Sequence, residues 1–209
     1  NTGISGGVHI YIKKRIPTAA GLGGGSADAA AVLLGLNKLY ETDLKDDVLC
    51  ELALKLGADV PFFIKGGTVR ARGIGEELTL LKPFESGYFV LAKSDSKPST
   101  AEMYRQLDNM EHIYINVDSA VKYCEENDIS GLCRVMNNSF ISVWDKSLLP
   151  QKLEKHNPLK VGLSGSGPTY FAVFENLKDA KKCCVQLKKD GITAFVATPC
   201  KKAIILKNE

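Results

Sequence analysis

The sequence predicts an α+β fold in two parts, because helical and strand-like segments are mixed early in the chain and segregated later. In residues 1–85, short apolar runs alternate with two helical patterns, which indicates an α/β domain. In residues 86–209, strand-like runs flank a series of helical patterns, which is typical of an α+β domain with one antiparallel sheet. The best boundary is Lys82–Gly87, which contains a proline and ends on glycine.

The first part is expected to open with a strand at Val8–Ile12 and to continue through a turn at Pro17. A helix should follow from Ser26 and Asp28, since both residue types favour helix N-termini. Further along, the expected elements are a helix at Leu44–Leu56 capped by Thr42 or Asp43, a strand at Val60–Ile64 with Pro61 near its start, and an extended run at Thr68–Ala71 before a turn at Gly73–Glu77.

The second part combines five strand-like runs with five helical patterns. The strands are expected at Tyr88–Ala92, Leu159–Leu163, Tyr170–Phe174, Ile192–Ala197 and Ala203–Leu206. The helices are expected at Thr100–Leu107, Val117–Glu126, Gly131–Trp144, Ser147–Lys155 and Leu177–Lys189. Ser94–Ser99 is polar and contains Pro98, so it is predicted to be a loop.

Composition excludes several classes of protein. Hydrophobic residues make up 44% of the 209 residues and charged residues 24%, which is ordinary for a globular protein and unlike a disordered or collagenous one. The net charge of +3 does not predict nucleic-acid binding, and no apolar run approaches the ~20 residues of a membrane span. The start of the chain has no signal-peptide pattern and lacks Met, so we expect it to begin inside a longer protein.

The six cysteines are spaced in a way that predicts neither a zinc site nor a disulfide framework. They include no CxxC pair, and the three histidines lie far from them in sequence. Reduced, mostly buried thiols in the cytoplasm are therefore expected.

A glycine-rich turn precedes the first predicted helix. Residues 21–25 read GLGGG and are followed by Ser26 and Asp28. Adjacent glycines let the backbone approach a ligand closely, and the free amides and dipole of a helix N-terminus favour an anion, most often phosphate. A plain flexible turn is the alternative. The pattern is not a Walker A loop, since no Gly-Lys pair occurs, and Ser26 stands where a dinucleotide fingerprint needs glycine.

The segment PTAAGLGGGSADAA resembles the phosphate loop of the GHMP small-molecule kinases, which act on galactose, homoserine, mevalonate and phosphomevalonate. The GLGGGS form, in place of GLGSSA, is similar to the branch that phosphorylates 4-diphosphocytidyl-2-C-methyl-D-erythritol in the non-mevalonate isoprenoid pathway. The resemblance implies ATP as co-substrate, Mg²⁺ bridging its phosphates, and Ser26 as a possible Mg²⁺ contact. The residues that it implies for ATP binding are Pro17, Thr18, Ala19, Ala20, Gly21, Leu22, Gly23, Gly24, Gly25, Ser26 and Ala27, with the amides of Gly23–Ala27 on the phosphates.

Asp59 is the candidate catalytic residue. It lies in GADVPFF, between a helix end and an apolar run, where a carboxylate could accept the proton of an attacking hydroxyl or simply cap a turn before Pro61. GADVPFF is similar to the segment that carries the catalytic aspartate of this kinase branch, so the resemblance implies that role for Asp59.

A second glycine turn follows between two predicted strands. A loose β-hairpin explains VGLSGSGPTYFAVF on its own, but the segment also resembles the third motif of the same family. The resemblance implies that Gly165, Ser166 and Gly167 line a cleft between two domains, beside Gly23–Ser26.

The chain also departs from the family pattern. Family members carry a further segment ahead of Asn1 with a catalytic lysine and the cytidine-binding residues, and neither Lys13 nor Lys14 is assigned to that role here. Three hypotheses therefore stay open: the diphosphocytidyl-methylerythritol kinase, another GHMP kinase acting on homoserine or a mevalonate, and a nucleotide-binding chain without turnover. A cytoplasmic monomer or homodimer is expected, with no nucleic-acid or membrane partner.

Overall fold

The computed structural model describes residues 6–94, 99–110, 116–144 and 147–207. The chain forms two compact units, of which the first contains residues 1–18, 23–83 and 200–209 and the second contains residues 19–22 and 84–199. The glycine-rich segment is therefore divided between the units after residue 22. The predicted domain limits, 1–85 and 86–209, stay a prediction. Among the described residues, no helix combines the length and apolar character that crossing a membrane requires.

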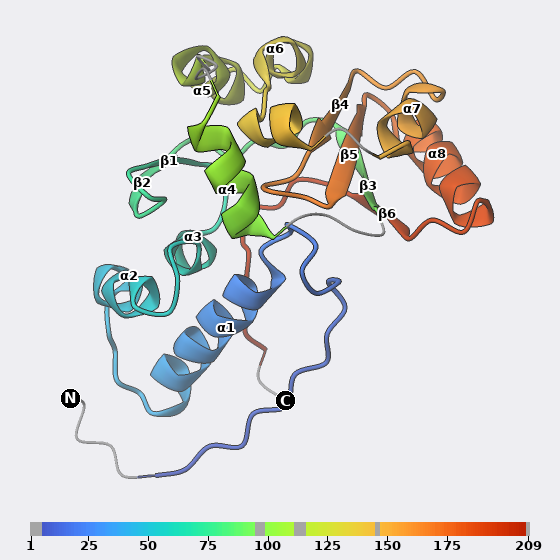
Figure 1. The fold of residues 1–209 in the computed structure, drawn as a ribbon. Helices are drawn as coiled ribbons and strands as arrows, with labels where there is room; N and C mark the ends of the chain where they lie inside the picture. Colours follow the sequence, from blue (N-terminus) through green and yellow to red (C-terminus); the bar gives the residue numbers. More distant parts are fainter. Residues whose placement is uncertain (1–5, 95–98, 111–115, 145–146, 208–209) are drawn as a thin grey trace. The chain divides into compact units, whose positions relative to one another are not determined.

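The first unit consists of three helices and a β-hairpin (Figure 1). Its elements are α1 (Gly24–Leu39), α2 (Asp46–Leu54), α3 (Val60–Lys65), β1 (Val69–Arg72) and β2 (Glu77–Leu80). A small core joins the three helices through Ala30, Ala53 and Val60, all nearly inaccessible to solvent. Phe63 of α3 packs against this core, so α3 is held against α1.

The predictions for α1 and α3 are wrong in part. Val60–Ile64 is helical and belongs to α3, because a proline in the first helical turn removes an amide that would have no acceptor there. A short apolar run does not by itself distinguish a strand from a helix. Helix α1 begins at Gly24 and not at Ser26, because Gly23 adopts a left-handed conformation (φ 63°) at the N-cap position.

The predicted strands at Val8–Ile12 and Ala203–Leu206 are not strands in the structure. Neither run is paired in a β-ladder among the described residues, and a strand needs a hydrogen-bonded neighbour. Ile204 instead packs on the core of the first unit. Helix α2 starts at Asp46 with Lys45 at its N-cap, so Thr42 and Asp43 do not cap it.

The second unit is a four-stranded antiparallel sheet with helices, as predicted (Figure 1). The strand order is β4-β5-β3-β6, and β3 pairs with β5 from Tyr88 opposite Phe174 to Lys93 opposite Thr169. Its elements are β3 (Tyr88–Lys93), α4 (Thr100–Asp108), α5 (Val117–Glu125), α6 (Ile129–Val135), the 3₁₀-helix η1 (Ser139–Val143), α7 (Leu149–Glu154), β4 (Lys160–Leu163), β5 (Thr169–Phe174), α8 (Leu177–Lys189) and β6 (Ala194–Ala197).

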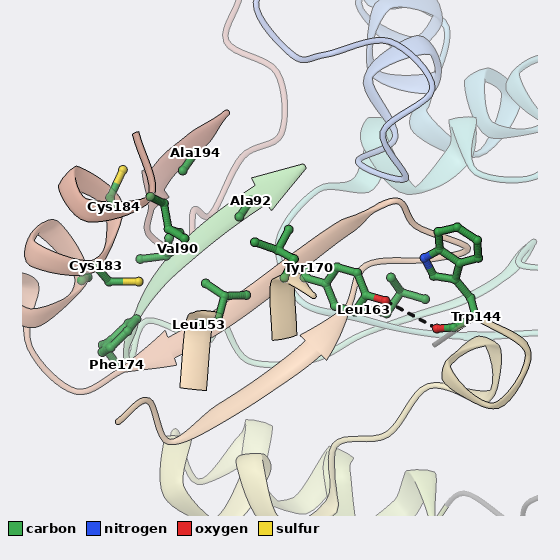
Figure 2. Close-up of a cluster of buried hydrophobic side chains, with 14 of the residues drawn as sticks. Val90, Ala92, Trp144, Leu153, Leu163, Tyr170, Phe174, Cys183, Cys184 and Ala194 are labelled. Atoms are coloured by element: carbon green, nitrogen blue, oxygen red, sulfur yellow. Dashed lines mark hydrogen bonds between the residues drawn. The ribbon is translucent and has the colours of Figure 1, made fainter. Parts of the chain in front are cut away.

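One face of this sheet forms the main core (Figure 2). Val90 and Ala92 alternate along β3 and lie opposite Ala172 and Tyr170 of β5, so all four side chains share a face. Residues of α7 and α8 complete the cluster, among them Leu153, Cys183, Cys184 and Leu187. Tyr170 donates its hydroxyl hydrogen to the Trp144 carbonyl oxygen at 3.4 Å (Figure 2). The core fixes β4 and β5, whose connection is the second glycine turn.

The predicted helix at Gly131–Trp144 is interrupted. Helix α6 ends at Val135, Met136 is extended (ψ 123°), and Asn138 caps the separate 3₁₀-helix η1. Two asparagines and a serine in sequence favour caps over a helix interior, since their side chains compete for backbone hydrogen bonds. Of the predicted loop Ser94–Ser99, residues 95–98 lie outside the described residues. All six cysteines are free thiols.

Candidate active site

The first half of the glycine-rich segment belongs to the second unit and rests on the second glycine turn. The Ser164 hydroxyl donates a hydrogen bond of 2.8 Å to the Gly21 carbonyl oxygen. Gly21 has φ +70°, and a Cβ there would lie 2.5 Å from the Ser164 carbonyl oxygen and 2.6 Å from that of Gly167. The close backbone approach therefore requires glycine at position 21.

The second half of the segment belongs to the first unit and forms the N-terminus of α1. Helix α1 has no side-chain cap, and the first amides of a helix have no acceptor within it. The Ala27 amide is engaged, since it donates to the Gly23 carbonyl oxygen at 2.9 Å. Of the amides predicted to bind phosphate, Gly23–Ala27, that of Ala27 is therefore used within the helix, whereas those of Gly24, Gly25 and Ser26 have no acceptor within it.

The three glycines at this helix end have different surroundings. A Cβ on Gly23 would lie 2.5 Å from the Phe63 ring, and one on Gly24 would lie 3.0 Å from Ile16. Gly25 is exposed and has nothing within 4 Å of a Cβ position. Gly23 is thus required for packing and Gly24 is tightly packed, whereas the absence of a side chain at Gly25 leaves open space around that residue.

Lys14 lies at the same helix end and was not assigned from the sequence. Its ammonium group donates to the Gly24 carbonyl oxygen at 3.2 Å and forms an ion pair with Asp28. Both side chains are about one-third exposed. A lysine in this position can add positive charge for a phosphate group at the helix end, although in this structure its charge is balanced by Asp28. Lys14 lies ten residues before Gly24 in a segment without regular secondary structure, so no local sequence pattern indicates this placement.

Asp59 is exposed and occupies the N-cap position of α3, but its side chain forms no capping hydrogen bond. The capping explanation for this residue is therefore not supported. Phe63, four residues later, packs against Gly23, since a Cβ there would lie 2.5 Å from its ring. The role of Asp59 as the catalytic carboxylate stays a prediction.

The second glycine turn connects β4 to β5 as a hairpin, as the sequence predicts. Gly165 and Gly167 have positive φ values of 54° and 75°. The Ser166 and Thr100 hydroxyls lie 2.9 Å apart, within hydrogen-bonding distance. Asn138 donates from Nδ2 to the Leu163 and Gly165 carbonyl oxygens, both at 2.8 Å. Sequence inspection missed Asn138, which lies 27 residues before Gly165. Placement of Gly165–Gly167 in an interdomain cleft stays a prediction.

The residues present fit an Mg²⁺ ion that arrives with a nucleotide. Within the described ranges, no group of three or more His, Cys, Asp or Glu side chains could hold a metal ion. Mg²⁺ in phosphoryl-transfer sites is commonly held by substrate phosphates with one or two protein oxygens. The Ser26 hydroxyl in the first turn of α1 and the Asp59 carboxylate are oxygen donors of that kind.

Comparison with known proteins gives the family. The sequence profile of the GHMP kinases N terminal domain matches residues 1–67, and that of the GHMP kinases C terminal region matches residues 149–193. A 4-diphosphocytidyl-2-C-methyl-D-erythritol kinase from Clostridium tetani is 39% identical over 93% of this chain and 71% of its own length. The chain belongs to the GHMP kinase family.

Other members support this assignment. The 4-diphosphocytidyl-2-C-methyl-D-erythritol kinase of Alkaliphilus metalliredigens is 44% identical over 87% of this GHMP kinase chain. A crystal structure of a 4-(cytidine 5'-diphospho)-2C-methyl-D-erythritol kinase aligns with a TM-score of 0.74 and 30% identity, over 89% of this chain and 68% of that one. The α+β GHMP-kinase fold is thereby confirmed. The chain spans only 64% of the length of the Alkaliphilus relative.

Proposed function

We propose that this chain binds ATP at the N-terminus of α1 and provides the phosphate-loop portion of a kinase that phosphorylates the 2-hydroxyl of 4-diphosphocytidyl-2-C-methyl-D-erythritol. The observation that carries the proposal is the free amide edge at Gly24–Ser26, with the Lys14 ammonium group hydrogen-bonded to the Gly24 carbonyl oxygen. Relatives about 40% identical bear the name of this kinase, which supports the choice of substrate.

The proposed chemistry consists mainly of positioning and neutralisation of charge. The amides of Gly24–Ser26 and the Lys14 ammonium group would hold phosphate oxygens, in a helix-end field that favours anions. Asp59 would orient the attacking hydroxyl and accept its proton. Mg²⁺ bound to the nucleotide would offset the negative charge of the phosphate oxygens.

Asp59→Asn tests the catalytic part of the proposal. The variant should leave ATP affinity nearly unchanged and lower the turnover rate by about 10²–10⁴-fold, the usual contribution of a general base. ADP release from the 209-residue chain is measured by a coupled assay with the diphosphocytidyl alcohol. Asp46→Asn removes another exposed carboxylate from the same unit and is the matched control.

Homoserine and mevalonate in the same assay test the runner-up kinases. ADP release with either of these, and none with the diphosphocytidyl alcohol, would contradict the proposed substrate. ATP binding should also be measured separately from turnover, since the chain spans 64% of the length of the Alkaliphilus relative. ATP binding by the 209-residue chain without turnover would support a nucleotide-binding function for this portion alone.

A further inference from the structure

The side chain of Asn138 forms three hydrogen bonds to backbone atoms at and near the second glycine turn. Its two amide hydrogens go to the carbonyl oxygens of Leu163 and Gly165, each at 2.8 Å. Its Oδ1 atom accepts the Phe140 amide at 2.9 Å, which caps η1. An asparagine side chain has two donors and one acceptor oxygen, so all of its polar atoms are used for holding backbone.

The turn that Asn138 holds is built from residues that do not fix their own conformation. Gly165 and Gly167 lose more conformational freedom on ordering than any other residue type would. Two backbone hydrogen bonds close the turn, from the Ser164 amide to Thr169 O at 2.9 Å and from the Gly167 amide to Ser164 O at 2.8 Å. The side chain of Asn138 adds two bonds from outside the hairpin and thereby restricts where Ser164 and Gly165 can lie.

Ser164 transmits this restriction to the phosphate loop. Its hydroxyl donates to the Gly21 carbonyl oxygen at 2.8 Å, and the carbonyl oxygens of Ser164 and Gly167 occupy the space that a Cβ on Gly21 would need. All of these residues belong to the second compact unit. Gly21 precedes Gly24 by three residues, so fixing Gly21 restricts the chain just before the amides that face the ligand.

We propose that Asn138 and Ser164 are positioning residues that hold the two glycine turns as one body and so preorganise the phosphate loop for the nucleotide. The proposal rests on ATP binding as the proposed function. A loop that is ordered before the ligand arrives does not have to lose that entropy on binding, which raises affinity.

Asn138→Asp separates the two hydrogen bonds that Asn138 donates to the turn from the bond that caps η1. Aspartate caps a helix as well as asparagine does, but it has no amide hydrogens and sets a carboxylate against two carbonyl oxygens. Without nucleotide, hydrogen–deuterium exchange of the variant should increase in residues 163–167 and also in residues 19–22. Asn116→Asp is the matched control. Asn116 caps α5 by accepting a hydrogen bond from the Ser119 amide, and its replacement by aspartate introduces the same negative charge.

ATP affinity, measured by calorimetry, tests the link to the ligand. Asn138→Asp and Ser164→Ala should each weaken ATP binding about five- to tenfold, and the double variant should lose less than the product because both act through one turn. Ser164→Ala removes a single hydroxyl and gives the same test if Asn138→Asp does not fold.

Two results would overturn the proposal. One is a rate of hydrogen–deuterium exchange in residues 19–22 of Asn138→Asp that equals the rate in the Asn116→Asp control. The other is faster exchange in Asn138→Asp and Ser164→Ala with undiminished ATP affinity. Absence of ATP binding by the parent chain would instead contradict the proposed function, and the exchange measurement would still decide whether these side chains hold the turns.

Discussion

Gly25 is the residue at which packing and ligand binding can be separated most cleanly. A side chain on Gly23 or Gly24 would meet Phe63 or Ile16, so changes there disturb the fold as well as the loop. Gly25 has no atom within 4 Å of a Cβ position and lies in the first turn of α1. Its lack of a side chain has no explanation in the packing of the described residues, which is what a ligand-facing position would show.

Gly25→Ala should therefore leave the protein folded while weakening ATP binding by at least tenfold. Alanine in a helix is favoured over glycine by about 0.5–1 kcal/mol, so the free energy of unfolding should rise slightly. Calorimetric titration with ATP and urea unfolding check the two parts. Gly35→Ala lies in the same helix with equally open surroundings and is the matched control. Equal ATP affinity in the two variants would count against the loop assignment.

Lys14 adds a charge to the same helix end. Its pair with Asp28 is partly exposed, and such pairs contribute about 0–1 kcal/mol to stability. The main effect of Lys14 should accordingly be on anion binding.

Lys14→Met should lower ATP affinity about tenfold and reduce its dependence on salt, because one cation near the phosphates is lost. Isothermal titration at two salt concentrations measures both effects. Lys13→Met changes the neighbouring exposed lysine by the same chemistry and serves as the control. An affinity indistinguishable from that of the parent would remove Lys14 from the site.

At the scale of elements, α8 shows how burial sets the chemistry of a side chain. Cys183 is 0% exposed against the sheet. Burial, followed by the neighbouring Cys184, raises the pKa of the Cys183 thiol from 9.0 to about 11. Because the neutral thiol is favoured in the folded state, Cys183 contributes stability that is fully present below pH 9 and is lost as the pH rises toward 11.

Cys183→Ala should destabilise the protein by about 1–2 kcal/mol at pH 7, and this deficit should shrink at pH 10.5. Denaturant unfolding under reducing conditions at both pH values measures the difference. Cys200→Ala removes an exposed thiol and should change the free energy of unfolding little at either pH. A deficit of equal size at both values would show that thiol ionisation is not coupled to unfolding.

The elements also show what local pattern can predict. Helix α8 has the predicted bounds, because Asn176 caps it and its apolar residues recur at helical spacing. Helix α3 was predicted as a strand, since a run of five apolar residues, Val60–Ile64, satisfies either period and the decision lies in packing against α1. The run Val8–Ile12 has the periodicity of a strand, but among the described residues it pairs with no neighbouring strand, and periodicity does not reveal whether such a neighbour exists.

The candidate site divides in the same way. The glycine run and Asp59 were found from sequence because each lies in a contiguous motif. Lys14 and Asn138 were not found, because each reaches its partner only through the fold, across ten and 27 residues. Their side chains contact backbone carbonyl oxygens, which carry no residue signature for a sequence pattern to detect.

At the scale of the whole molecule, the glycine-rich segment is part of both compact units. Residues 19–22 belong to the second unit and the helix that follows them belongs to the first. The two halves need small residues or free amides for different reasons. At Gly21 the backbone of another turn comes close, and at Gly24–Ser26 the helix end has amides without an acceptor in the helix. The two halves are covalently joined, so nucleotide binding at the helix end should be sensed by both units.

Backbone amide chemical shifts, recorded while ATP is added to the isotope-labelled 209-residue chain, test the central claim most directly. The account predicts saturable shifts that are largest for the amides of Gly24, Gly25 and Ser26 and smaller for residues 19–22. Saturable binding that leaves Gly24–Ser26 unshifted, or no binding of ATP by the chain, would contradict it.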